Sequence, residues 1–187
     1  MNITPTMTLE KLIEDVQGLR AIAPDLSAHW HCMNITAACS GAFLGKSRRA
    51  NMRKFDSRHD CDMAGIGTRS YIKHVKGSFE DWMAEIVVRI AEAAVSLGVN
   101  AVDKDAKDPF SYQVEQRARP LPADLETLLS RYVVASIIEF AAAQASGRTI
   151  AGLLVNSPIC SVDLWCKMSG IDLYRHIELV VSNRGKV

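Results

Sequence analysis

The segment at residues 78–100, "SFEDWMAEIVVRIAEAAVSLGVN", gathers its acidic side chains near its start. Hydrophobic residues at helical spacing predict that the segment is a helix, with Ser78 as its N-cap and Gly98 as its end. Two carboxylates one turn apart on such a helix would lie on one face and hold a hard cation such as Mg²⁺. One turn before Glu85, however, the chain has Trp82 in place of a second acid.

Basic residues concentrate just before this helix. Residues 44–76 carry nine bases against three acids, so the segment is +6 while the whole chain is only +1. Such a segment is either a solvated loop with a positive face or an anion site that suits phosphates. The bases are Lys46, Arg48, Arg49, Arg53, Lys54, Arg58, Arg69, Lys73 and Lys76.

Length and composition are typical of one soluble globular domain or of two small units that share a core. The chain has 187 residues, of which 48% are hydrophobic, and five cysteines. An odd number of cysteines in apolar or helical contexts favours reduced thiols. No apolar run reaches the length of a membrane span, and the N-terminal residues lack the pattern of a signal peptide. We therefore expect a cytoplasmic protein that makes no membrane contact.

Hydrophobic periodicity predicts an all-α fold. Residues 1–100 form one predicted helical unit, residues 101–122 a linker, and residues 123–187 a second unit that completes the same core. A faint echo between the two units suggests two fused bundle halves. The segment from Asn51 to Ser70 is expected to be the least regular part, and Val133 to Ala143 to be buried. The first helix is expected after Thr8. Three more are expected from His29 to Gly45, from Ser78 to Gly98 and from Ala123 to Ala145. A further helix is expected to begin at Ser157-Pro158, and the last to run from Asp172 to Val181.

Three short blocks carry a resemblance to a known family. They are "GKSRRANMRKF", "YIKHVKGSFEDWMAEIVVRI" and "SGIDLYRHIEL", and together they cover about a third of the chain. In this order they resemble the MazG-like branch of the all-α nucleotide pyrophosphohydrolases, although this chain interposes about seventy residues before the third block. The resemblance implies a helical bundle, assembly into dimers or larger oligomers, and Mg²⁺ held by two pairs of acids on two helices.

The family's acid positions fall here on Thr36, Cys39, Trp82 and Glu85, so only Glu85 keeps a carboxylate. One carboxylate does not hold Mg²⁺ between phosphates, because the ion gives up its waters reluctantly. The resemblance therefore implies a site that has lost its metal and needs no cofactor. Trp82 is then either a stacking surface for a base or an ordinary aromatic packed on the neighbouring helix.

The sequence leads us to expect a protein that binds a nucleotide or nucleotide-derived molecule without hydrolysing it. Trp82, Thr36 and Cys39 would line the pocket, and its bases would take the phosphates. One alternative is an active, Mg²⁺-dependent pyrophosphohydrolase that uses Asp81, Glu85 and Glu139; another is a helical platform for protein interaction. The four bases expected at the pocket mouth are Arg48, Arg49, Lys73 and Lys76.

The roles of several other metal-capable, nucleophilic or acidic residues are left open by the sequence. "HWHC" at residues 29–32 and "RHDCD" at residues 58–62 contain metal-capable atoms, but neither has the spacing of a zinc site. Cys39 paired with a histidine would make a nucleophile only if a base were positioned beside it. Glu139 lies in an apolar stretch, so it reaches a base, faces a pocket, or lies on an exposed stripe.

Overall fold

The structure is a computed structural model that describes residues 7–20, 26–55, 66–99, 107–112, 124–148 and 152–184. Helix makes up 77% of it, and no strand occurs in these ranges. The predicted all-α fold is therefore confirmed. The helices are α1 (Leu9–Arg20), α2 (Ala28–Leu44), α3 (Met52–Phe55), α5 (Ile66–His74), α6 (Phe79–Ser96), the 3-10 turn η1 (Pro109–Ser111), α7 (Leu125–Thr127), the π-helical η3 (Leu128–Val134), α8 (Ala135–Ala145), α9 (Leu153–Met168) and α10 (Leu173–Asn183).

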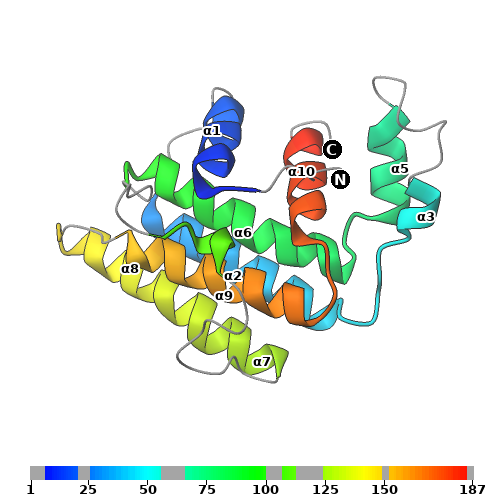
Figure 1. Cartoon of the computed structure of the whole chain (residues 1–187). Coiled ribbons are helices and arrows are strands. Elements are labelled where there is room, and N and C mark those ends of the chain that lie inside the picture. The colour runs from blue at the N-terminus through cyan, green and yellow to red at the C-terminus, as the bar shows by residue number, and fades with distance from the viewer. Residues whose placement is uncertain are drawn as a thin grey trace.

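Helix α6 runs through the middle of the molecule. In Figure 1, α1 and α10 lie above it and α2, α9 and α8 lie below it, while α3 and α5 form one end. Helix α6 packs against α1, α2, α9 and α10, and α8 packs against α2 and α9. One hydrophobic cluster draws on α1, α2 and α6 and also on η3, α8, α9 and α10. The core thus takes side chains from both ends of the chain.

The ends of α6 follow from its sequence. The Ser78 side chain accepts a hydrogen bond from the Asp81 amide, as an N-cap does. Acidic residues in the first turn favour the positive end of the helix dipole. At the other end Gly98 adopts a φ of 65°, a conformation that costs glycine little and favours termination of the helix. Thr8 and Asp172 cap α1 and α10 in the same way, as the sequence predicts.

The predicted start of a helix at Ser157-Pro158 is wrong. Helix α9 begins at Leu153, and Pro158 lies inside it rather than at its start. Val155 and Ile159, one turn apart, are both buried in the core, so packing holds the helix together across the proline. In the segment expected to be least regular, residues 52–55 and 66–74 are helical, and the amide of Asn51 donates to the carbonyl of His74 to join them. Residues 56–65 lie outside the described part.

The prediction that Val133 to Ala143 is buried is also wrong. Only one side of this segment packs on α2 and α9, and the opposite side stays accessible, with Ile138 55% exposed. The run Leu125–Ala145 is the one described segment long and apolar enough to cross a membrane, a test that a core helix of a soluble protein also passes. Residues 128–134 of this run are π-helical, a geometry found often at functional sites.

Asp108 ties a distant segment onto the start of the chain. One carboxylate oxygen accepts from the backbone amide of Leu9 at 2.8 Å, and the other accepts from the amide of Phe110 at 2.9 Å. The same carboxylate therefore caps both α1 and η1. Phe110 is buried in the core, so this carboxylate joins the start of α1 to the backbone of a core residue.

Lys167 holds the same segment from α9. Its Nζ atom lies 2.7 Å from the Asp163 carboxylate and donates to the carbonyl of Phe110 at 3.0 Å. Asp163 is almost fully buried, and burial raises the pKa of its carboxyl. A buried carboxylate needs such a partner, because an unpaired charge in the core is costly.

We expect Asp108→Ala to lower the free energy of unfolding by about 1–3 kcal/mol, because the partly buried backbone amides of Leu9 and Phe110 lose their acceptor. Ser111→Ala removes a neighbouring but exposed hydrogen bond to the carbonyl of Asp108 and serves as the control, with a change under about 0.5 kcal/mol. Urea denaturation followed by circular dichroism measures both. Equal effects of the two substitutions would contradict the role assigned to Asp108.

Candidate functional site

Glu85 lies on α6 between two arginines. Its Oε2 atom accepts from Nε of Arg89 at 2.9 Å and from Nη1 of Arg184 at 2.7 Å. Arg184 also donates through Nη2 to Oε2 of Glu92 at 2.6 Å. The carboxylate that the resemblance assigns to a metal is thus paired with two guanidinium groups of the protein itself.

Arg89 extends this network to α2. Its Nη1 donates to the backbone carbonyl of Asn34 at 2.7 Å and to the side-chain oxygen of Asn34 at 2.6 Å. The acid Glu85 and the two arginines therefore connect α6 with α2 and with the end of α10. Less than a quarter of the side-chain surface of Glu85, Arg89 or Arg184 is exposed, so water screens these pairs only in part.

A cavity of about 240 Å³ opens beside this network. Three bases and one acid lie among its lining residues, so the cavity has a positive excess that attracts anions. We call it the arginine pocket. Its lining residues are Tyr71, Lys76, Glu85, Arg89, Val180, Asn183 and Arg184.

Asp81 serves the backbone turn before α6. It accepts from the Tyr71 hydroxyl at 2.5 Å and from the backbone amide of Gly77 at 2.7 Å. Asp81 is buried, and this burial raises the pKa of its carboxyl. Gly77 has a φ of 71°, which permits the tight turn that brings its amide to Asp81. The two oxygens of Asp81 are thus engaged, one by Tyr71 of α5 and the other by Gly77 of the turn.

Trp82 fills a notch in the adjacent helix. A Cβ atom added to Gly41 of α2 would lie 2.6 Å from the indole ring, and one added to Gly45 would lie 3.3 Å from it. The absence of side chains at these two glycines is therefore what lets the half-buried ring lie against α2. Such contact is the packing role that the sequence left open for Trp82. Its stacking on a base stays a prediction.

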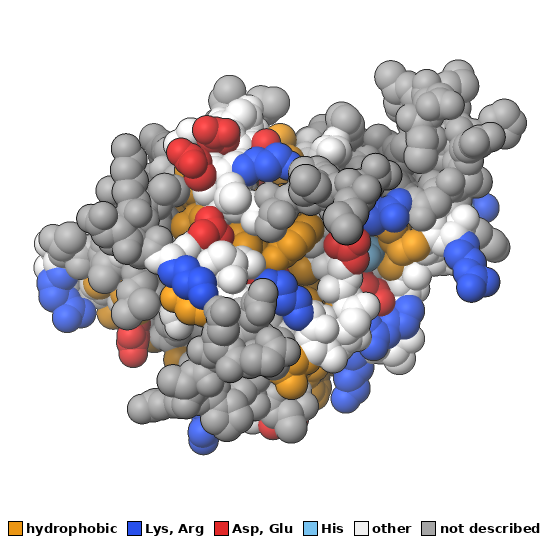
Figure 2. Space-filling view, viewed as in Figure 1, with side chains coloured by type: hydrophobic (Ala, Val, Ile, Leu, Met, Phe, Trp, Pro, Cys, Tyr) orange, Lys and Arg blue, Asp and Glu red, His pale blue; other side chains and the backbone are white. Residues whose placement is uncertain are grey.

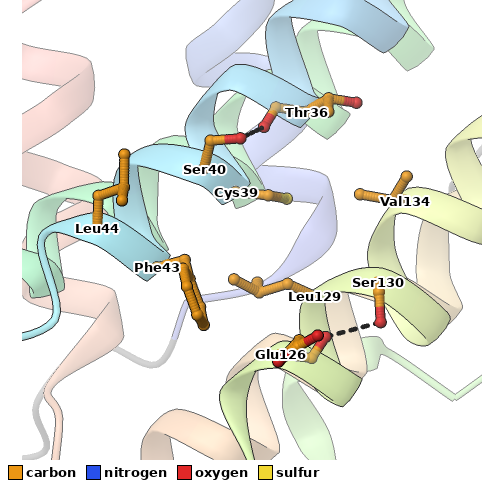
Figure 3. Close-up of a pocket in the computed structure, with 9 residues that line it drawn as sticks. All are labelled: Thr36, Cys39, Ser40, Phe43, Leu44, Glu126, Leu129, Ser130 and Val134. Carbon is orange, nitrogen blue, oxygen red and sulfur yellow. Dashed lines mark hydrogen bonds between the residues drawn. The ribbon is translucent and has the colours of Figure 1, made fainter.

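Thr36 and Cys39 line a different and larger cavity, of about 630 Å³, between α2 and the α7–η3 run. Figure 3 shows the side chains of Cys39, Phe43 and Leu129 directed into it. We call it the α2–η3 groove. The hydroxyl of Thr36 donates to the carbonyl of Cys32 at 2.8 Å, which leaves the walls largely apolar. The groove residues are Thr36, Cys39, Ser40, Phe43, Leu44, Glu126, Leu129, Ser130 and Val134.

The structure thus places the four aligned positions in three settings. Thr36 and Cys39 line the α2–η3 groove, Trp82 lies against Gly41, and Glu85 lines the arginine pocket. No three His, Cys, Asp or Glu side chains of the described ranges come together as a metal-binding group. Of the two clusters weighed for zinc, the one at residues 58–62 lies outside those ranges.

The basic residues divide in a similar way. Of the four predicted at the pocket mouth, Lys76 lines the arginine pocket, whereas Lys73 is exposed on α5. Arg49 pairs with Glu80 at 3.2 Å and lies 4.9 Å from the centre of the Phe79 ring. Arg48 approaches Gly77. Figure 2 shows basic side chains around the end that carries α3 and α5, with acidic ones among them.

Sequence reasoning missed Arg89 and Arg184. Arg89 follows Glu85 by four residues, a spacing that signals an ion pair on a helix. Arg184 gave no such signal, because only the fold brings the end of α10 to α6. Glu139, the third acid of the enzyme alternative, is exposed on α8, a helix that packs against α2 and α9.

No family model, curated protein or solved structure gives a significant match to this chain. The resemblance to the MazG-like family therefore rests on the three blocks of sequence alone.

The contact between Trp82 and Gly41 predicts that the effect of Gly41→Ala on the free energy of unfolding changes sign when the indole is removed. In the wild-type background, we expect Gly41→Ala to lower the free energy of unfolding by about 1–3 kcal/mol, because the new methyl group overlaps the indole. In a Trp82→Ala background the same substitution should stabilise by up to about 1 kcal/mol, because alanine is the better helix former.

Gly18→Ala on α1 is the matched control, since nothing lies within 4 Å of a Cβ atom there. It should stabilise both backgrounds equally. Chemical denaturation of the six proteins measures these differences. If Gly41→Ala has the same effect with and without Trp82, the packing role of the indole is refuted.

Burial raises the pKa of Cys39 to about 12, so its thiol is neutral near pH 8 and a poor nucleophile. We expect Cys39 and the fully buried Cys166 to resist iodoacetamide in the native protein, while Cys32 and Cys160, which are partly accessible, react faster. Peptide mapping by mass spectrometry measures the labelling, and urea-unfolded protein gives the full signal for each cysteine. Rapid native labelling of Cys39 would revive the cysteine-nucleophile hypothesis.

Proposed function

We propose that this protein binds a nucleotide or nucleotide-derived ligand through its phosphate groups at the arginine pocket, without metal-dependent hydrolysis. The observation that supports this most is the position of the Glu85 carboxylate between Arg89 and Arg184. Arginine is the side chain best suited to bind phosphate, because its guanidinium group donates several hydrogen bonds in one plane.

The same position argues against Mg²⁺ at Glu85. A cation there would have to displace at least one guanidinium from the carboxylate and would then lie beside two positive charges. Mg²⁺ also demands near-octahedral oxygen ligands, and Glu85 alone offers few. An anion instead meets a lining in which Lys76, Arg89 and Arg184 outnumber the Glu85 carboxylate, and the excess of positive charge remains when the Glu92 carboxylate that pairs with Arg184 is counted as well.

The size of the arginine pocket limits what enters it. At about 240 Å³ it is smaller than the cavities that enclose whole drug-sized ligands. A phosphate or diphosphate group fits this volume, and the remainder of a nucleotide would extend outside it. Lys76 is exposed at the turn before α6, so its ammonium group can reach such a ligand at the rim.

The enzyme alternative requires Asp81, Glu85 and Glu139 to act together on Mg²⁺. Asp81 is engaged by Tyr71 and Gly77, and Glu85 by two arginines. Glu139 is solvent-exposed on α8. These engagements favour the binding function over hydrolysis.

We expect pyrophosphate or a nucleoside diphosphate to bind in the presence of EDTA, and the affinity to fall as salt is raised. Lys76→Met should weaken binding about tenfold if the ammonium makes a direct phosphate contact. Lys73→Met is the matched control, because Lys73 carries the same charge three residues away and does not line the pocket. Its affinity should stay within about twofold of wild type.

Isothermal titration calorimetry with a panel of mono-, di- and cyclic nucleotides and pyrophosphate measures these affinities. Thermal shift provides a second readout, because a ligand that binds only the folded state raises its stability. The proposal fails if no compound binds, or if the Lys76 and Lys73 variants lose affinity equally.

A further inference from the structure

The α2–η3 groove has the size of a small-molecule site and is separate from the arginine pocket. Its volume of about 630 Å³ lies within the range of cavities that bind whole small molecules, and the two cavities share no lining residue. Cys39 and Leu129 of its lining are buried, whereas Ser40 and Ser130 are exposed. The groove is therefore accessible from solvent and offers buried apolar surface to a ligand.

The π-helical geometry of η3 brings two apolar side chains to one wall of the groove. Leu129 and Val134 are five residues apart, and both line it. In an α-helix, two such side chains would point about 140° away from each other. In η3 the amide of Ala135 donates to the carbonyl of Ser130, five residues earlier, so each turn contains one residue more. The wide turns thus help to form the groove, which gives this unusual geometry a use.

The hydroxyl groups of the lining offer acceptors to a ligand. The hydroxyl of Thr36 already donates to the carbonyl of Cys32. Those of Ser40 and Ser130 donate to the carbonyls four residues earlier, at 3.1 and 2.7 Å (Figure 3). Each hydroxyl has a single proton, so only its oxygen lone pairs remain for a further hydrogen bond. These groups favour a ligand that donates hydrogen bonds.

Glu126 determines the sign of the charge in the groove. It is exposed, and it is the one charged residue among the 9 described residues that line the groove. An ionised carboxylate accepts hydrogen bonds and donates none, so it adds to the acceptors of the hydroxyl groups. Lys46 lies 5.0 Å from the centre of the Phe43 ring but does not line the groove. Charge complementarity therefore favours a cation with N–H donors.

We infer that the α2–η3 groove binds an organic ammonium ion with an apolar body. The apolar body lies against Cys39, Phe43 and Leu129, and the ammonium group pairs with the Glu126 carboxylate. Burial of the apolar body supplies most of the affinity, while the carboxylate selects the sign of the head group.

Three ligands with the same decyl chain and different head groups test the selection of charge. Decylammonium should bind about threefold or more tightly than 1-decanol, and decanoate should bind more weakly than the alcohol. Added salt should weaken the binding of decylammonium and leave that of decanol unchanged. Octylammonium should bind about fivefold more weakly than decylammonium, because it buries two methylene groups fewer. Isothermal titration calorimetry below the aggregation concentration of each ligand measures these affinities.

Substitutions in the lining locate the site. Glu126→Gln removes the charge and keeps the shape, so decylammonium should lose about threefold or more in affinity while decanol loses none. Glu139→Gln is the matched control, because Glu139 is an exposed acid that does not line the groove. Ser130→Phe should fill the groove and weaken both ligands about tenfold or more. Ser146→Phe is its control, because Ser146 is also exposed and also donates to the carbonyl four residues earlier.

Circular dichroism confirms that each variant is folded. The inference is overturned if none of the ligands binds at up to about 1 mM, or if decanol or decanoate binds as tightly as decylammonium. Equal losses of decylammonium affinity in Glu126→Gln and Glu139→Gln would also overturn it, because the pairing would then not be specific to the groove.

Discussion

The pairing of the Glu85 carboxylate with two arginines is the interaction on which the arrangement of this molecule most depends. The carboxylate lies near the middle of α6 and accepts from Arg89 and Arg184, which in turn bind Asn34 of α2 and Glu92 of α6. Half-buried charges of this kind cost free energy unless each finds a partner. The network therefore constrains where α2 lies and where α10 ends, and it leaves the arginine pocket beside them.

The positions that align with the acids of the resembled family lie in separate places in this structure. Glu85 is paired with Arg89 and Arg184, while Thr36 and Cys39 line the α2–η3 groove. Trp82 lies against Gly41 where a second acid of α6 would otherwise be. Apolar packing and ion pairs within the protein thus occupy the positions at which a metal would need oxygen ligands.

Local signals in the sequence predicted the parts of the fold that depend on local physics. Ser78, Thr8 and Asp172 cap helices as expected, because a cap needs only a side chain three residues from an amide. The helix through Pro158 was missed, because burial of Val155 and Ile159 outweighs the local penalty of proline.

The candidate site was predicted less well, because most of it is made by residues far apart in the chain. Glu85 and Lys76 were expected in the site, and both line the arginine pocket. Arg184 lies 99 residues from Glu85 and carries no local pattern that reports the contact. The burial of α8 was overestimated, because hydrophobic composition does not say which side of a helix finds a partner within its own chain.

The most direct test of this account is the release of pyrophosphate from nucleoside triphosphates with Mg²⁺ or Mn²⁺. If Arg89 and Arg184 stay paired with the Glu85 carboxylate, the wild-type protein should release no more pyrophosphate than its Glu85→Ala variant. Activity in the wild type well above that variant would contradict the account, because it would show that Glu85 leaves its arginines to bind a metal.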